Sequence, residues 1–364
     1  MKLHLILIGN KFIYDKPLKE YIIRKIEQKT NFIDSTTYFK ESDNSLFLHL
    51  EKELNASNKI IIVTTKQHFS TVGKLICTVT SDNQVLNDNM LIPSKANVYE
   101  DRTYLLEYEN SITNVLHVDE MQKFPEILLH FDDSRATLHL FDENKENAIT
   151  ILNPIAIMFD ININYTTLID GWLRIDLDSK KYGNISKFIH NAKEILPNKL
   201  IASPSIINFI IERLSSNNKK ISFAESCTGG LLSYYFTEQN GASKVLDGSL
   251  VTYSNALKEN WLGVENETLI THGAVSNDVV LEMSNGVINV SEADYAISIS
   301  GIAGDTGGTE LKPVGTVHVG VRTKKEHKEI ELHLNGDRNY IQHQSVLFAL
   351  KMLISIDKEI FFKI

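Results

Sequence analysis

The stretch that most constrains this chain is a short apolar run at 221–223, followed directly by Ala-Glu-Ser-Cys-Thr-Gly-Gly at 224–230. The apolar residues predict a buried β-strand, and the small residues and paired glycines predict a sharp turn into a helix. Such a turn exposes Ser226 beside backbone N–H groups at a helix start, which favour an anion. Ser226 is then either an N-cap or a nucleophile with an oxyanion site beside it. A base close to Ser226 would favour the nucleophile over the N-cap, and Lys258 is the candidate base.

The composition narrows the functional class. A length of 364 residues allows two or three domains, and a net charge of −9 argues against general nucleic-acid binding while allowing a small phosphorylated ligand. The two cysteines, Cys77 and Cys227, lie far apart with no Cys/His cluster, so no disulfide framework, zinc site or other metal site is predicted. This use of cysteine fits a reducing, cytoplasmic location. The N-terminal apolar run is too short for a signal peptide or membrane span, and we expect it to be the first strand.

Three parts with different patterns follow one another along the chain. Residues 1–125 combine short β-branched runs with amphipathic segments and predict an α/β domain. Residues 126–200 predict a small α+β linking module. Residues 201–364 alternate helical and extended segments and predict a three-layer α/β/α domain. The expected strands are 3–8, 59–64, 136–140, 172–177, 221–223, 249–253, 294–300, 316–322 and 329–334, and the expected helices are 17–28, 45–54, 185–195, 206–214, 256–262, 277–290 and 340–356.

Four loops of the third part are rich in small or reactive residues, and each follows or ends a predicted strand. They span 225–230, 251–255 with Lys258 one helical turn later, 300–308, and 335–338. Because ligands of open α/β sheets bind beyond the carboxyl ends of the strands, these loops are expected to line one cleft.

At this point the chain resembles the C-terminal domain of the competence/damage-inducible CinA family. The matching segments are AESCTGG from Ala224, VTYSN from Val251 with its trailing lysine, HGAVS at His272–Ser276, SGIAG from Ser300, Gly307-Gly308, KPVGTV at Lys312–Val317 and GDR at 336–338. In that family this domain is nicotinamide-nucleotide amidase. The resemblance implies a serine amidase with Ser226 as nucleophile, Lys258 as base, and Tyr253, Ser300 and Arg338 at the other active-site positions.

The chemistry that the resemblance implies needs an oxyanion site and a neutral lysine. Backbone N–H groups around Cys227–Gly229 would hold the oxyanion, and a lysine works as a base only if burial or a neighbouring cation lowers its pKa. Arg338 is expected either to be that cation or to bind the substrate's phosphate. The expected substrate-binding and oxyanion residues are Cys227, Thr228, Gly229, Gly230, Gly301, Gly304, Gly307 and Gly308. No cofactor is expected, and the family suggests a homo-oligomer. Asp305 departs from the family pattern, which has proline there.

The first part resembles the family less well. Full-length CinA proteins begin with a molybdopterin-cofactor-binding-like domain associated with metal-dependent ADP-ribose pyrophosphatase activity. In this chain Gly9-Asn10-Lys11 and the segment from Thr64 to Gly73 lack the glycines and carboxylates of that pattern. We therefore expect a degenerate domain that keeps the fold and has lost this activity.

Simpler interpretations stand beside these. Lys258 on an isolated helix is usually a solvated surface residue, and Arg338 could be a helix-start residue paired with Asp337. Cys227 is expected to be a small buried residue that supplies a backbone N–H rather than a thiol nucleophile. Two alternative functions remain beside the amidase: a metal-dependent nucleotide pyrophosphatase in the first domain, and a competence or damage-response protein that acts by binding alone.

Overall fold

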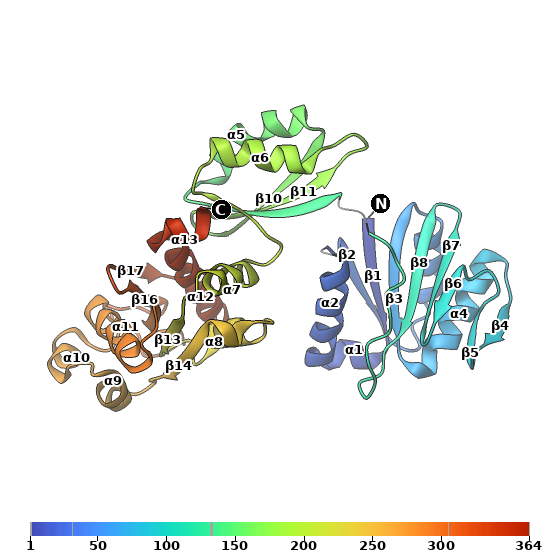
Figure 1. Cartoon of the computed structure of the whole chain (residues 1–364). Helices are drawn as coiled ribbons and strands as arrows, with labels where there is room; N and C mark the ends of the chain where they lie inside the picture. The colour runs from blue at the N-terminus through green and yellow to red at the C-terminus, as the bar shows by residue number, and fades with distance from the viewer. Residues whose placement is uncertain (1, 31, 132–133, 305, 364) are drawn as a thin grey trace. The chain divides into compact units, whose positions relative to one another are not determined.

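The computed structural model describes residues 2–30, 32–131, 134–304 and 306–363 (Figure 1). The chain forms two compact units, residues 1–133 and 134–364, and each is described by itself. The three-part division expected from the sequence stays a prediction. The second unit contains two distinct β-sheets, which are described in turn below.

The first unit is α/β. Its main sheet has the order β2-β1-β3-β8-β7-β6, in which β2, β1, β3 and β8 are parallel and β7 and β6 are antiparallel. The strands are β1 (Lys2–Ile8), β2 (Ser35–Phe39), β3 (Asn58–Thr64), β6 (Val98–Glu100), β7 (Thr103–Tyr108) and β8 (Ser111–His117), and a separate hairpin joins β4 (Gln84–Asn87) to β5 (Met90–Pro93).

Helices cover both faces of this sheet. They are α1 (Asn10–Tyr14), α2 (Lys16–Thr30), α3 (Leu46–Leu54) and α4 (Lys66–Thr80). Alternate strand residues point to opposite faces. Leu5 and Leu7 therefore join the core under α1 and α2, whereas Ile6 and Ile8 join the core under α3 and α4.

The second unit begins with a small α+β module whose sheet has the order β10-β11-β9-β12. Its elements are β9 (Arg135–Phe141), α5 (Lys145–Met158), β10 (Ile161–Ile169), β11 (Trp172–Ser179), α6 (Ile185–Ile195) and β12 (Leu200–Ala202). One face of the sheet packs under α5 and α6. The other face places Phe141 and Trp172 in the same core cluster as residues of the C-terminal sheet.

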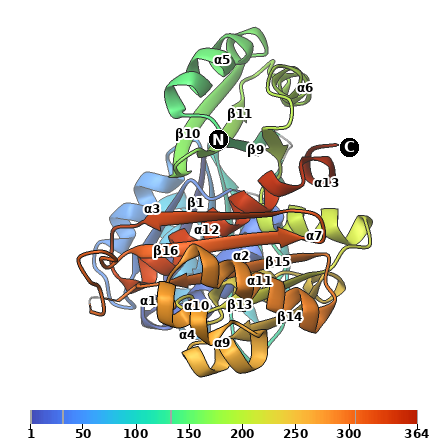
Figure 2. The same cartoon turned by 90° about the vertical axis from the view of Figure 1, so that its left-hand side faces the viewer.

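The rest of the second unit is built on a sheet of order β14-β13-β15-β16-β17, seen with its flanking helices in Figure 2. β14, β13 and β15 are parallel, and β16 and β17 add an antiparallel hairpin. The elements are α7 (Ile206–Ser216), β13 (Ile221–Glu225), α8 (Leu231–Thr237), β14 (Leu246–Val251), α9 (Asn255–Leu262), α10 (Asn266–His272), α11 (Asn277–Ser291), β15 (Tyr295–Gly301), β16 (Thr316–Thr323), β17 (His327–His333), α12 (Arg338–Ile356) and α13 (Lys358–Phe362).

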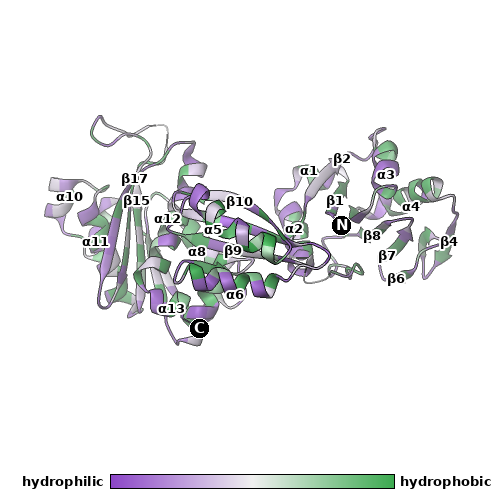
Figure 3. Ribbon diagram, turned by 90° about the horizontal axis from the view of Figure 1, so that it is seen from above, coloured by the Kyte–Doolittle hydropathy of each residue, from purple (hydrophilic) through white to green (hydrophobic). Residues whose placement is uncertain are grey.

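This part has three layers. Phe223 and Ile297 pack with α7, α8 and α12 on one face, whereas Ala224 and Ala296 pack with α9, α10 and α11 on the other. The flanking helices accordingly carry both hydrophobic and hydrophilic residues, as the two colours in Figure 3 show. The three-layer α/β/α fold expected for the C-terminal part is confirmed.

Most expected elements agree with the structure to within a few residues. The strand expected at 249–253 lies earlier, at Leu246–Val251. Consequently Thr252 and Tyr253 belong to the loop beyond the strand, where backbone carbonyls are free to accept side-chain donors. Along the described parts of the chain, no helix combines the length and apolar character needed to cross a membrane.

Candidate active site

Ser226 lies at the carboxyl edge of the C-terminal sheet, between β13 and α8. Its N–H donates to the carbonyl of Ile299 at 2.9 Å, and its own carbonyl accepts the N–H of Gly229 at 3.1 Å. Gly229 and Gly230 have φ angles of +59° and +99°, in the left-handed region that favours glycine. These two residues turn the chain into α8, and Ser226 is held in the turn with 8% of its surface exposed.

A buried carboxylate fixes the far side of this turn. Glu225 is 0% exposed, although it carries a carboxyl group. It ends β13, whose other residues are also buried. One oxygen, Oε2, accepts the N–H groups of Gly230 at 3.1 Å and Leu232 at 3.0 Å. The other, Oε1, accepts the Ser233 N–H at 3.0 Å and the Ser249 hydroxyl at 3.1 Å. Glu225 therefore occupies the start of α8 with a negative charge, which helix N-termini favour.

This arrangement shows which of the expected oxyanion donors are already hydrogen-bonded within the protein. The N–H groups of Gly229 and Gly230 already have acceptors, in the Ser226 carbonyl and the Glu225 carboxylate. Within the described residues, the N–H of Cys227 has a contact only with its own thiol sulfur, and the N–H of Thr228 has no acceptor. Burial raises the pKa of the Cys227 thiol to about 12, so this thiol stays protonated at neutral pH. The loop therefore offers two main-chain donors beside Ser226 and no thiolate.

Lys258 reaches Ser226 from α9. Its Nζ lies 3.1 Å from Ser226 Oγ, and its side chain is 1% exposed, so it is no surface lysine. Helix α9 is seated closely because Gly286 of α11 faces the Leu262 backbone, where a Cβ atom would collide. Ser254 caps the helix by accepting the Leu257 N–H at 3.3 Å.

The contacts of Lys258 suit a neutral amine. Its Nζ donates to the carbonyls of Thr252 at 2.7 Å and Tyr253 at 3.4 Å. A neutral amine has two N–H bonds and one lone pair, so these carbonyls can take both N–H bonds and leave the lone pair for the Ser226 hydroxyl. Burial lowers the pKa of Lys258 because desolvation penalises the ammonium form. This arrangement is one that a serine nucleophile and a lysine base require.

Tyr253 and Ser300, two other expected site residues, contribute differently. Tyr253 gives its backbone carbonyl to Lys258, while its side chain is 62% exposed at the rim. Ser300 is 1% exposed and donates its hydroxyl to the Ala274 carbonyl at 2.7 Å. Through this bond Ser300 ties the end of β15 to the loop before α11.

Arg338 lies against the glycine-rich loop. It begins α12 and is exposed, and its guanidinium lies over Gly304, where a Cβ atom would collide with it. Asp337 caps α12 by accepting the Tyr340 N–H at 2.8 Å, and among the described residues no carboxylate pairs with Arg338. An arginine so placed can meet an anionic substrate group.

The expected loop glycines have different surroundings. Gly301 and Gly308 lie against the main chain of 313–317, where a Cβ atom would be too close, whereas Gly307 has a left-handed φ of +93° and open space. Asp305, which departs from the family pattern, lies outside the described residues.

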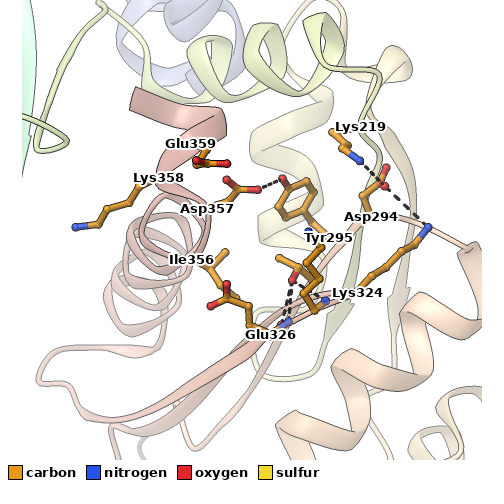
Figure 4. A pocket seen from close by; sticks show the side chains of 11 residues that line it. Lys219, Asp294, Tyr295, Lys324, Glu326, Ile356, Asp357, Lys358 and Glu359 are labelled. Atoms are coloured by element: carbon orange, nitrogen blue, oxygen red, sulfur yellow. Dashed lines mark hydrogen bonds and ion pairs between the residues drawn. The ribbon is translucent and has the colours of Figure 1, made fainter. Parts of the chain in front are cut away.

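The opposite, amino edge of this sheet carries a separate cavity of about 460 Å³ (Figure 4). Its polar groups pair with one another: Asp294 lies 3.0 Å from Lys219, and the Tyr295 hydroxyl donates to Asp357 at 2.7 Å. None of the expected site residues lines it. The chemistry expected from the sequence is thus concentrated at the carboxyl edge.

In the first unit, a cavity of about 300 Å³ lies where β1, β3 and β8 end. Lys11 pairs there with Glu120, and α4 begins at Lys66, directly after β3. His117 lines the same cavity. A search of the described residues for three or more His, Cys, Asp or Glu side chains placed to hold a metal finds no such group.

Comparison with known proteins places the C-terminal part in a family. The sequence model of the CinA C-terminal domain matches residues 204–356, which contain Ser226, Lys258 and Arg338. The stretch 204–356 thus belongs to the CinA C-terminal domain family. A CinA-like protein of Endomicrobium trichonymphae is 46% identical over 38% of this chain and 33% of its own length. A protein of Thermoanaerobacter sp. (strain X514) named as competence-damage inducible is 40% identical over 49% of this chain and 41% of its own length.

These matches cover one part of each protein. The matched region of this chain spans 41% of the Thermoanaerobacter relative and 33% of the Endomicrobium relative, so well under half of each. Among solved structures, the competence/damage inducible protein CihA from Agrobacterium tumefaciens is 39% identical, with 42% of this chain and 93% of that chain covered and a TM-score of 0.41.

Sequence reasoning singled out Ser226 and Lys258 but gave no role to Glu225. The signal was present, because a carboxylate that ends a buried strand needs hydrogen-bond donors. The sequence does not show where those donors come from, since Ser249 lies on the neighbouring strand β14.

Proposed function

We propose that this chain is an amidohydrolase that converts nicotinamide mononucleotide to nicotinate mononucleotide and ammonia. The observation that carries the proposal is the 3.1 Å contact between Ser226 Oγ and the buried Lys258 Nζ. The resemblance to the CinA-family amidase domain supplies the substrate class. The two unpaired, buried cysteines suit a cytoplasmic setting for this reaction.

In the first half-reaction, neutral Lys258 takes the proton of the Ser226 hydroxyl as Oγ attacks the carboxamide carbon. The carbonyl π electrons move onto the oxygen, and the N–H groups of Cys227 and Thr228 stabilise the resulting oxyanion. When the tetrahedral intermediate collapses, the C–N bond breaks and the proton held by Lys258 goes to the departing nitrogen. Ammonia leaves and an acyl ester on Ser226 remains.

In the second half-reaction, Lys258 takes a proton from a water molecule that attacks the ester carbon. The same donors hold the second oxyanion, and its collapse breaks the bond to Ser226 Oγ, which regains its proton from Lys258. The product is a carboxylic acid, which ionises at neutral pH. No redox step or external co-reactant is needed.

The phosphate of the substrate needs a cationic partner, and Arg338 is the candidate. Its guanidinium is exposed over the glycine-rich loop, and a planar fork of donors suits phosphate. Lys258 does not serve this purpose, because its Nζ is directed to Ser226 and to backbone carbonyls.

Ammonia release from nicotinamide mononucleotide by the purified full chain, with and without EDTA, tests the proposal. We expect EDTA-insensitive release that Ser226→Ala abolishes. Ser205→Ala is the matched control, because Ser205 caps α7 away from the site and loses one cap bond, at a cost of about 1 kcal/mol. Ammonia release by Ser226→Ala at the wild-type rate would end the serine-amidase proposal.

A further inference from the structure

The carbonyl of Cys227 is held by a side chain from a distant helix. Gln342, one turn into α12 from Arg338, donates through Nε2 to the Cys227 carbonyl at 2.6 Å. Gln342 is half-buried, and 115 positions separate the two residues in the chain. No sequence motif connects them, and the reaction described above gives Gln342 no role.

The direction of this bond matters because a trans peptide unit is planar and its C=O and N–H point in opposite directions. The Cys227 carbonyl and the Thr228 N–H belong to the same unit. With the carbonyl held towards α12, the Thr228 N–H points away from that helix. Within the described part of the chain this N–H has no acceptor, and Thr228 is 3% exposed.

The neighbouring peptide unit is held in a similar way. It joins the Ser226 carbonyl to the Cys227 N–H, and its carbonyl accepts the Gly229 N–H at 3.1 Å. The N–H groups of Cys227 and Thr228, which form no hydrogen bond to another described residue, therefore belong to peptide units whose carbonyls are fixed. The main chain fixes one unit, and the Gln342 side chain fixes the other.

We propose that Gln342 is a positioning residue that orients the Cys227–Thr228 peptide so that the Thr228 N–H serves as an oxyanion donor to the Ser226 adduct. This inference rests on the proposed serine-amidase function. Without the Gln342 donor, the peptide is free to rotate, and the Thr228 N–H no longer has a fixed direction. Removal of an oxyanion donor costs roughly 10²–10³ in kcat, and loss of its orientation costs part of that.

The test uses Gln342→Leu, which keeps the side-chain bulk without the donor, and Gln342→Glu, which places a carboxylate against the carbonyl. Gln344→Leu on the same helix is the matched control, because in the described part of the chain Gln344 forms no hydrogen bond to the loop 226–230. Each variant is assayed on nicotinamide mononucleotide and on p-nitrophenyl acetate, an activated ester that acylates a reactive serine next to an oxyanion site. Thermal melts accompany both assays.

We expect Gln342→Leu to lower kcat on the nucleotide by roughly 10- to 100-fold with little change in KM, and Gln342→Glu to lower it further. The Ser226-dependent release of p-nitrophenolate falls in the same order, while Gln344→Leu matches wild type in both assays. A purely structural role would instead lower the melting temperature and the active fraction without this split between kcat and KM.

The two assays separate this inference from the proposed function. If the nucleotide is not hydrolysed but Gln342→Leu still slows ester acylation at least tenfold, the orienting role stands and the substrate proposal falls. If both Gln342 variants acylate at the wild-type rate, the orienting role is refuted. It is equally refuted if wild type releases p-nitrophenolate no faster than Ser226→Ala.

Discussion

Replacement of Glu225 by glutamine should destabilise the C-terminal domain more than its modest chemical change suggests. The four donors around this carboxylate divide evenly between its two oxygens. In Glu225→Gln one of these oxygens becomes an NH2 group, which donates and cannot accept. The least unfavourable orientation places the NH2 group in the Oε1 position. There the Ser249 hydroxyl can turn round to accept, and only the Ser233 N–H loses its acceptor.

The magnitude follows from this orientation. One buried N–H left without a partner costs about 1–3 kcal/mol. The two bonds to Gly230 and Leu232 change from a charged to a neutral acceptor, which weakens each by about 1 kcal/mol. The sum is about 3–5 kcal/mol, which corresponds to a melting temperature lower by roughly 10 °C for a domain of this size.

Urea and thermal unfolding of the full chain, followed by circular dichroism, measure this effect. Ser249→Ala provides the graded control, because it removes one of the four donors and leaves the carboxylate intact, for an expected cost of about 1 kcal/mol. A Glu225→Gln variant within about 1 kcal/mol of wild type, or more stable than Ser249→Ala, would refute the claim that the carboxylate holds the start of α8.

The remaining predictions concern the catalytic groups and the first unit. Lys258→Ala should lower turnover at least about a hundredfold, and Lys258→Arg should not restore it, because a guanidinium stays protonated; full activity of the arginine variant would contradict a base. Because burial lowers the pKa of Lys258, the unfolded chain binds the additional proton between the two pKa values. Wild type should therefore gain stability relative to Lys258→Met as pH rises from 6 towards about 10, and parallel melting curves would contradict this. Arg338→Ala should raise KM strongly, and wild type should hydrolyse nicotinamide riboside poorly; equal efficiency on nucleotide and riboside excludes a phosphate role. With Mg²⁺, Mn²⁺ or Co²⁺ the chain should not hydrolyse ADP-ribose, and AMP release at a rate similar to deamidation would overturn the degenerate assignment of the first unit.

The sequence predicted the secondary structure best where periodicity was strong. The helix expected at 185–195 has the observed bounds of α6, and the hairpin of β16 and β17 was expected within two residues. Helix α5 was not predicted, since Pro154 lies inside it and its hydrophobic pattern is weak. Helix α4 was not predicted either. It is rich in β-branched residues, and burial of Phe69, Val72 and Ile76 against the sheet outweighs their low helix propensity.

For the site, the resemblance to the CinA family implied that Ser226 and Lys258 act together, and the structure brings them within hydrogen-bond distance. The oxyanion donors could not be assigned from the sequence and required the three-dimensional structure. Gly230 was expected to offer its N–H to a ligand, but that N–H bonds Glu225. Which N–H groups stay unpaired depends on contacts between β13, β14 and α12, and these contacts join residues far apart in sequence.

These contacts also bear on the proposed role of Lys258 as a base near a buried carboxylate. Glu225 is two positions before Cys227 and one before Ser226, and an ion pair between Glu225 and Lys258 would favour the ammonium form and remove the base. The structure instead surrounds Glu225 with three backbone N–H groups and one hydroxyl, all neutral donors. Lys258 faces backbone carbonyls and Ser226, and within the described residues no carboxylate pairs with it. The hydrogen-bond donors at the start of α8 thus satisfy the Glu225 carboxylate, and desolvation is left to lower the pKa of Lys258.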